Sequence, residues 1–115
     1  MMHSSEVWLV NLDPTVGPEI NKTRPAIIVN RDAVGRLPLR VVVPLTSWKA
    51  HYSRVPWMVR IEPTPGNGLD KVSAADAFQV RSVAEQRFVR RLGTIEENEL
   101  RAVRTALSIV LQTEP

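Results

Sequence analysis

The chain has 115 residues, of which 43% are hydrophobic and 23% charged, and these proportions predict one folded domain over residues 1–115. No apolar run approaches the roughly 20 residues that a membrane helix needs, and the first residues lack an apolar signal core. The absence of cysteine excludes disulfides, thiolate metal sites and a cysteine nucleophile. We therefore expect a cytoplasmic protein without a membrane anchor.

The cations are unequally divided between the two basic residue types. The formal net charge is only +3, but twelve of the fifteen Lys and Arg residues are arginine. The planar arginine fork suits phosphate and stacks on bases, whereas lysine is a point charge. Biased codon usage would produce the same excess, so composition permits a nucleic-acid partner without requiring one.

The first half of the chain alternates strand-forming runs with breakers. Three runs predict strands: residues 6–12, 24–30 and 39–45. The loop over 13–23 is long and rich in Pro, Gly and Asn, a pattern typical of functional or mobile loops. Pro44 indicates an edge, a bulge or a strand end. Thr46 and Ser47 are expected to leave the third strand and enter a second loop over 48–54.

The second half is predicted to contain shorter strands. Residues 57–61 form a fourth strand, and a break rich in Pro and Gly follows it. Residues 71–80 have weak strand character, and 82–86 predict one helical turn. Residues 88–92 form the last short strand, which Gly93 closes.

An amphipathic helix is predicted at the C-terminus. Thr94 caps it, and Glu97 three residues on completes a capping box. One apolar stripe at helical spacing is assigned to the core: Leu100, Val103, Leu107, Val110 and Leu111. Short strands followed by one such helix predict a mainly β fold, a small barrel or strongly curved sheet with the helix packed against it.

Most familiar catalytic sets are missing from the sequence. His3 lies near the terminus and His51 stands alone in a loop, and neither has metal-ligand spacing. There is no Gly-rich phosphate loop and no nucleophile elbow. The sequence therefore predicts neither a metal site nor a cofactor.

One cation and one hydroxyl remain as candidates for chemistry. Pro25 favours extended backbone at Arg24, so this guanidinium starts from a strand entrance. If the second and third strands are antiparallel neighbours, Arg24 and Thr46 meet at one sheet edge. An arginine fork can bind a phosphate and stabilise charge that develops on it, and a hydroxyl can donate a further hydrogen bond.

A purely structural interpretation of the same residues stays open at this point. Arg24 could pair with Glu19 or Asp13, and Thr46 could cap a turn. The aromatic side chains are equally ambiguous, because Trp48, Tyr52, Trp57 and Phe78 could stack on unpaired bases or fill a barrel mouth or dimer contact. Arg87, Arg90 and Arg91 could follow a phosphate backbone or form a solvated strand face.

The order of motifs resembles the MazF/PemK family of toxin endoribonucleases over nearly the whole chain. The runs that carry the resemblance are Glu6–Leu12, Asp13-Pro14, Gly17-Pro18-Glu19, Lys22–Val29, Val41–Thr46, Phe78–Val83 and Gly93-Thr94 with the terminal helix. In that family, the arginine of the Arg-Pro pair and the threonine after the third strand's apolar run are catalytic. These positions are Arg24 and Thr46 here.

The resemblance implies an SH3-like barrel that acts as a homodimer. It also implies metal-independent, sequence-specific cleavage of single-stranded RNA through the RNA's own 2′-hydroxyl, without a cofactor. A cognate antitoxin would inhibit the toxin by laying an extended segment over the active groove. Substrate binding is assigned to five residues: Glu19, Asn21, Lys22, Ser47 and Gln79.

Two departures from the family pattern affect the expected specificity. Many members carry glycine near Ile20 and Asn21, and the usual Arg-Gly-acidic opening is replaced by Ser4-Ser5-Glu6. We expect altered sequence preference rather than loss of activity. Two rivals are a CcdB-like toxin that targets DNA gyrase and a non-catalytic RNA-binding barrel. The ending Thr113-Glu114-Pro115 lacks the tryptophan expected for the first rival.

Overall fold

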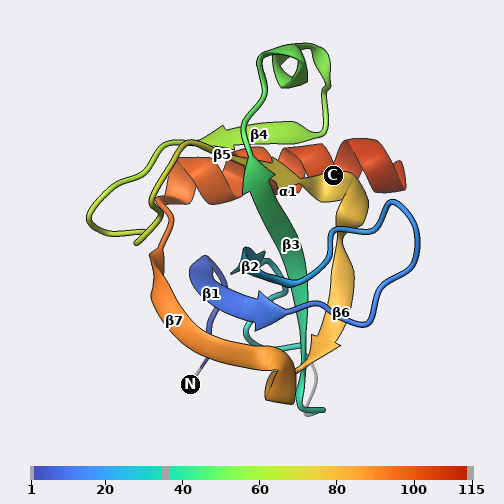
Figure 1. Cartoon of the computed structure of the whole chain (residues 1–115), viewed down its shortest axis with the longest axis vertical. Helices are drawn as coiled ribbons and strands as arrows, with labels where there is room; N and C mark the ends of the chain where they lie inside the picture. Colours follow the sequence, from blue (N-terminus) through green and yellow to red (C-terminus); the bar gives the residue numbers. More distant parts are fainter. Residues whose placement is uncertain (1, 35–36, 114–115) are drawn as a thin grey trace.

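The structure is a computed structural model that describes residues 2–34 and 37–113, and in these ranges one antiparallel sheet packs against one α-helix (Figure 1). The strands and helix are β1 (Glu6–Asn11), β2 (Thr23–Ile28), β3 (Leu39–Ser47), β4 (Met58–Ile61), β5 (Ser73–Asp76), β6 (Arg81–Ala84), β7 (Phe88–Thr94) and α1 (Glu97–Leu111). Short 3₁₀ turns are η1 (Ala50–Arg54), η2 (Ala77–Gln79) and η3 (Glu85–Arg87). The predicted mainly β fold with a C-terminal helix is confirmed.

Strand β3 is central because it pairs with three other strands. Its middle pairs with β2 on one edge, while β6 and β5 share the other edge in succession. The β6 pairing stops at Val42 and the β5 pairing starts at Leu45, so Pro44 lies between them. A residue without an N–H is tolerated there because no ladder bond is needed from it. Pro44 therefore marks a change of partner within the strand.

The end of the predicted third strand is corrected by this pairing, whereas its start at Leu39 is as predicted. Thr46 and Ser47 do not leave the strand, because they pair with Ala74 and Ser73 of β5. The expected loop after them begins only at Trp48 and contains η1. Thr46 is consequently held by a ladder on a rigid element.

The predicted helical turn over 82–86 is wrong for most of its length. Residues 81–84 form β6 instead, because they pair with Leu39–Val42 of β3. Only the following residues of η3 turn helically. Tertiary pairing overrides a weak local helix preference here. The weak strand predicted over 71–80 is real only as β5, after which the chain turns into η2.

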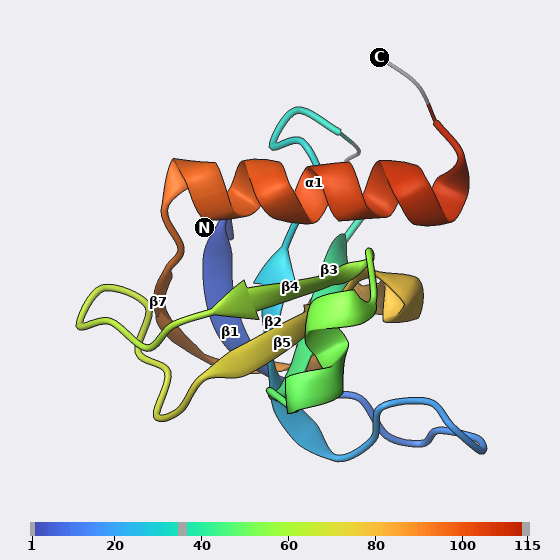
Figure 2. The same ribbon diagram turned by 90° about the horizontal axis from the view of Figure 1, so that it is seen from above.

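The loop after β4 contacts β7, so the two strands at opposite ends of the sheet, β4 and β7, are brought together. Thr94 N donates to Gly66 O at 2.8 Å, and the two backbones lie side by side (Figures 1 and 2). A Cβ at Gly93 would lie 2.2 Å from Gly66 O, and one at Gly68 would lie 2.3 Å from Leu92 O. Only glycine permits this approach, so these contacts close the curved sheet toward a barrel.

The sheet buries apolar side chains on both faces. Along β2 and just after it, Ile27 and Val29 face one cluster while Ala26 and Ile28 face the other. Helix α1 covers the first cluster, to which it contributes Leu100 and Val103 (Figure 2). Burial on both faces explains why this part of the sequence is a continuous apolar run rather than an alternating one.

The helix begins two residues later than predicted. Thr94 is the last residue of β7, so it cannot cap α1. Glu96 is the N-cap, and its backbone N–H donates to the Glu99 carboxylate at 2.9 Å in a capping box. The carboxylates still lie where the helix dipole favours negative charge.

The apolar stripe of α1 is core only over its first part. Leu100 and Val103 are buried as predicted, whereas Leu111 is 57% exposed. Ile109 is 50% exposed beside it. The assignment of the whole stripe to the core is therefore wrong at the last turn. No helix within residues 2–34 and 37–113 is long and apolar enough to span a bilayer.

We predict that Gly93→Ala lowers the free energy of unfolding by about 1–3 kcal/mol, because the added methyl meets backbone atoms that cannot rotate away. Gly66→Ala is the matched control, since its Cβ would meet only Thr64 Oγ1 at 3.8 Å. The control should change stability by less than about 1 kcal/mol. Urea denaturation measures both, and equal losses would contradict the proposed close contact.

Candidate active site

Arg24 is held at the entrance of β2, as the sequence predicts. The strand begins at Thr23, and the half-buried Arg24 side chain donates from Nε to the Asn21 carbonyl at 3.1 Å. Lys22 precedes it with φ of 68°, and its N–H donates to the Asp13 carboxylate at 3.1 Å. These two hydrogen bonds at the end of the loop fix the position from which the Arg24 side chain extends.

The ion pairs considered for Arg24 from sequence do not form among the described residues. The Glu19 carboxylate accepts instead from Val16 N at 2.7 Å, within the loop's own turn. Asp13 accepts from Thr15 and from the backbone of Lys22. The guanidinium nitrogens beyond Nε therefore remain available for a ligand.

Thr46 lies opposite Arg24 when the strand register is continued. The observed β2–β3 pairs run from Ile28 with Val42 to Ala26 with Pro44. Two further steps pair Arg24 with Thr46, and residues directly opposite each other share one face. Within the described ranges, the Thr46 hydroxyl makes no hydrogen bond, so it is not used to cap a turn.

Both side chains border one cavity of about 320 Å³, here called the Arg24 cavity. Ser47 also lines it, together with apolar residues from three elements: Leu45, Leu69 and Leu92. Its charged lining residues are Arg24, Asp70, Lys71 and Arg90. An apolar base with a charged rim can hold a nucleotide's phosphate at the rim and exclude water below it.

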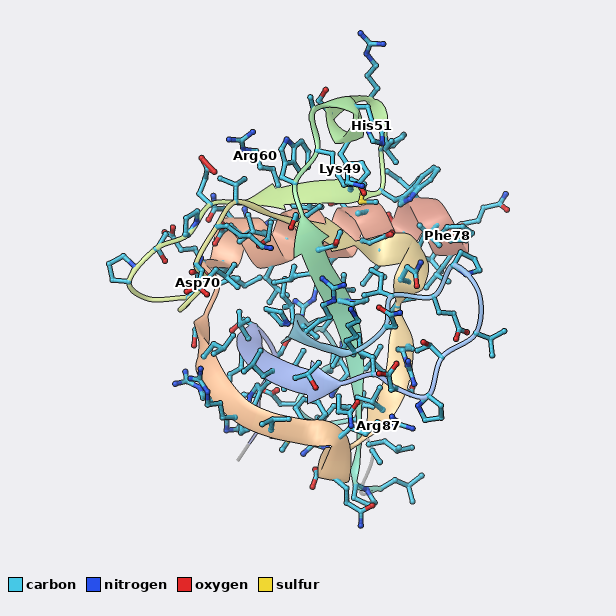
Figure 3. The ribbon with its side chains drawn as sticks, in the orientation of Figure 1. Lys49, His51, Arg60, Asp70, Phe78 and Arg87 are labelled. Carbon is cyan, nitrogen blue, oxygen red and sulfur yellow. The ribbon has the colours of Figure 1, made fainter. Side chains whose placement is uncertain are left out.

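A second cavity of about 420 Å³, the Gln79 cavity, lies on the other side of the β3 end. Glu19, Gln79 and Pro44 line it, and the next residues of β3, Leu45 and Thr46, line the Arg24 cavity. Figure 3 shows Asp70, at the rim of the first cavity, and Phe78, at the second, on opposite sides of β3. Five of the seven predicted site residues thus line one of the two cavities: Arg24, Thr46 and Ser47 line the first, and Glu19 and Gln79 line the second.

Gln79 has a structural function that the sequence did not indicate. Its amide nitrogen donates to Pro18 O at 3.0 Å, and its oxygen accepts from Ile20 N at 3.0 Å. These two bonds hold the loop on both sides of Glu19. Asn21 and Lys22 line neither cavity and contribute main-chain contacts at the end of the loop.

Asp76 is a positioning residue that sequence reasoning missed. It is only 8% exposed, and its carboxylate accepts from Phe78 N at 3.1 Å, which caps η2 and thereby places Gln79. Burial raises the pKa of Asp76, and backbone hydrogen bonds from Phe78 and Gln79 partly oppose the rise. The available signal was an aspartate at the end of a strand, since aspartate is a preferred cap of helical turns.

The aromatic side chains considered for base stacking form two groups, both separate from the edge-on pair of Trp8 and Phe88. Trp48 and His51 each pack edge-on against Tyr52 around η1, and Arg60 lies 5.6 Å from the Trp48 ring centre. Trp57 packs against Phe78 at 5.8 Å. In the described part of the chain, no three His, Cys, Asp or Glu side chains gather as metal ligands.

These features define a class: a small antiparallel barrel with a C-terminal helix and an arginine–threonine pair at the end of its central strand. The family described as "PemK-like, MazF-like toxin of type II toxin-antitoxin system" matches residues 3–111. The chain therefore belongs to the PemK-like, MazF-like toxins of type II toxin–antitoxin systems.

Similar proteins cover almost the full chain. Endoribonuclease MazF9 of Mycobacterium tuberculosis is 36% identical over 118 residues, which cover 96% of this chain and 97% of MazF9. The crystal structure of MazF from Deinococcus radiodurans has a TM-score of 0.80 at 24% identity, covering 97% of each chain. An endoribonuclease in complex with its cognate antitoxin, from a mycobacterial species, has a TM-score of 0.78 at 18% identity, covering 100% of this chain and 99% of that one.

We predict a pH-dependent stability term from Asp76. Because its folded pKa is raised, the folded state binds more protons than the unfolded state, so stability falls as pH rises from 3.8 through the folded pKa. Asp76→Asn should remove this decline in the free energy of unfolding. Asp70→Asn is the control, because it removes a carboxylate that is exposed. Urea denaturation of the three proteins across this pH range measures the difference. The prediction would be contradicted if the difference in unfolding free energy between wild type and Asp76→Asn stayed constant with pH.

Proposed function

We propose that this toxin is an endoribonuclease that cleaves single-stranded RNA without a metal ion, with Arg24 and Thr46 as its catalytic residues. The observation that carries the proposal is that both side chains border one cavity from neighbouring strands. The family match and the 36% identity to an endoribonuclease support the activity. The reaction takes place in the cytoplasm, where the transcripts are.

The RNA supplies the nucleophile in this reaction. The 2′-hydroxyl attacks the adjacent phosphorus, the bond from phosphorus to the 5′-oxygen breaks, and the products are a cyclic phosphate and a 5′-hydroxyl. The 2′-hydroxyl loses a proton and the leaving oxygen gains one. Arg24 stabilises the charge on the non-bridging oxygens, because its fork presents several donors at once. A guanidinium group is a hydrogen-bond donor only, so Arg24 does not accept this proton.

Thr46 donates its hydroxyl to the same phosphate and fixes its orientation. Ladder pairing with Ala74 holds the Thr46 backbone, so only the side-chain torsion and the hydroxyl have to be ordered when substrate binds. Ser47 extends this donor set on the same cavity. Glu19 and Gln79 contact the nucleotide that occupies the adjoining cavity, and Asn21 and Lys22 set the shape of the loop above it.

The inhibitory partner is a cognate antitoxin. A protein of the same fold is known in complex with its antitoxin, which supports this part of the proposal. An extended antitoxin segment that follows β3 would cover the Arg24 and Gln79 cavities together, since consecutive residues of β3 line them: Pro44 lines the Gln79 cavity, and Leu45 and Thr46 line the Arg24 cavity. Such a segment would compete directly with RNA.

The toxin acts as a homodimer through an apolar surface, the α1-end patch, formed by Trp57, Phe78, Ile109 and Val110. Phe78 is 69% exposed although it is a large aromatic residue. Contiguous exposed apolar surface of this kind favours protein–protein contact. A second copy is the occupant we propose, because the antitoxin is assigned to the cavities and the patch shares only Phe78 with them.

Arg24→Ala and Thr46→Ala should each reduce cleavage by at least about a hundredfold, because each removes a donor that stabilises the transition state. Circular dichroism and melting should stay close to wild type, since the lost Nε bond of Arg24 contributes only about 1 kcal/mol. Long RNA is incubated with EDTA, and primer extension maps the breaks. Arg24→Lys should not rescue the activity, whereas Thr46→Ser should retain part of it.

Three outcomes of this assay have distinct meanings. Breaks at a recurrent short motif with EDTA present support the proposal. Intact RNA that is nevertheless bound indicates a non-catalytic RNA-binding barrel. Wild-type cleavage by either alanine variant rejects the catalytic assignment while leaving the activity itself in place.

Ile109→Asp should convert the dimer to a monomer, because it places a carboxylate in an apolar contact. Val34→Asp is the control, since Val34 is 60% exposed but lies outside the patch. Light scattering after size exclusion gives the mass of each protein. A wild type that is monomeric at micromolar concentration, or a control that dissociates equally, would refute the assigned surface.

A further inference from the structure

The arginines of β7 and η3 differ in what their side chains do. Arg87 donates to the carbonyls of Asn11 and Asp13, and so ties η3 to the end of β1. Arg91 lies 3.5 Å from the carboxylate of Glu6, which is almost fully buried. Both cations therefore serve the fold. Figure 3 also shows Arg87 near the lower end of the barrel, away from Asp70.

Arg90 differs from both neighbours in its surroundings. It is exposed, and its side chain makes no hydrogen bond or ion pair with any residue of the ranges 2–34 and 37–113. It pairs with Leu9 of β1, which in turn pairs with Pro25 of β2. Its side chain borders the Arg24 cavity.

Lys71 reaches the same cavity from the loop between β4 and β5. This loop is anchored, because Asn67 is 1% exposed and its side chain bonds three backbone groups nearby, including Glu62 O at 2.8 Å. The Lys71 carbonyl accepts from Ser73 Oγ at 3.1 Å. The exposed ammonium is thus carried by a backbone that is already ordered.

The charges around the cavity favour an anion with more than one phosphate. Arg24, Lys71 and Arg90 outnumber the one carboxylate, Asp70, on its rim. Arg24 and Arg90 start from strands on either side of β1, so their backbones are about 10 Å apart. Two long cations separated in this way can each contact a different phosphate of one chain.

We infer that Arg90 and Lys71 bind the phosphate next to the one that is cleaved, and so position single-stranded RNA across the Arg24 cavity. The inference rests on the proposed endoribonuclease function. Arg24 and Thr46 act on the reacting phosphate, whereas Arg90 and Lys71 contact its neighbour and contribute to binding. We therefore expect Arg90 and Lys71 to affect KM, the salt dependence of cleavage and the register in which the RNA binds, rather than kcat.

The test uses RNA oligonucleotides built on the mapped cleavage motif. Arg90→Gln and Lys71→Gln should each raise KM roughly tenfold, because each removes a charged hydrogen bond, while kcat stays within about twofold. The slope of log(kcat/KM) against log salt should become shallower by about 0.7 per variant. Arg101→Gln is the matched control, since Arg101 lies on α1 and pairs only with exposed Glu97. It should change neither quantity.

Neutral methylphosphonates identify the phosphate that is bound. Replacing the phosphate on one particular side of the cut site should weaken wild type as much as Arg90→Gln does, and should leave Arg90→Gln unchanged. If no single replacement removes the difference between wild type and variant, Arg90 contributes only net charge and the inference fails. Equal salt slopes for Arg90→Gln and Arg101→Gln would also overturn it.

Binding to an uncleavable analogue separates this inference from the proposed activity. An oligonucleotide with a 2′-deoxy sugar at the cut site binds without reacting, and fluorescence anisotropy gives its Kd. Loss of affinity in Arg90→Gln and Lys71→Gln supports the inference even where Arg24→Ala proves not to control cleavage. Unchanged affinity in both variants rejects it even where the Arg24 assignment holds.

Discussion

The arrangement of the site depends on one backbone contact, the approach of the loop at Gly66 and Gly68 to β7 at Gly93. No side chain fits between these backbones, because a Cβ at Gly93 would lie 2.2 Å from a carbonyl oxygen. The contact joins strands that lie at opposite ends of the sheet order. It therefore closes the sheet, and it also sets the distance between the loop that carries Lys71 and the strand that carries Arg90. Closure of the fold and shape of the cavity are consequences of the same packing.

The long loop before β2 is ordered by a different means, namely hydrogen bonds to its main chain. Gln79 bonds Pro18 and Ile20, and Asp76 holds Gln79 by capping η2. Arg81 donates to Leu12 O at 3.0 Å at the loop's start. A loop held through its backbone can change its side chains without changing its path. This arrangement gives a physical reason why the side chains at positions 20 and 21 can change while the backbone that carries Arg24 stays in place.

Sequence reasoning predicted the strands and the helix well where a long apolar pattern carried the signal, as in β2, β3 and α1. It failed where pairing decided the outcome. The third strand was predicted to end at Leu45, just after Pro44, with Thr46 and Ser47 leaving it, yet the exchange of partners on one edge of β3 allows the proline inside a strand that continues to Ser47. Arg24 and Thr46 could be found from residue type and antiparallel geometry. Asp76 and the second function of Gln79 could not, because both depend on contacts between segments far apart in the chain.

The excess of arginine acquires a specific meaning once the side chains within residues 2–34 and 37–113 are placed. Arg81 and Arg87 donate to carbonyls of the chain leaving β1, and Arg40 forms an ion pair with Glu85 at 2.8 Å. Arginines used in this way hold elements together and are already partly neutralised or hydrogen-bonded. A polyanion is instead attracted by the cations left without partners, and in the described structure Arg90 is one of these at the cavity rim. A modest net charge is therefore compatible with strong local attraction, because much of the positive charge is committed to the fold.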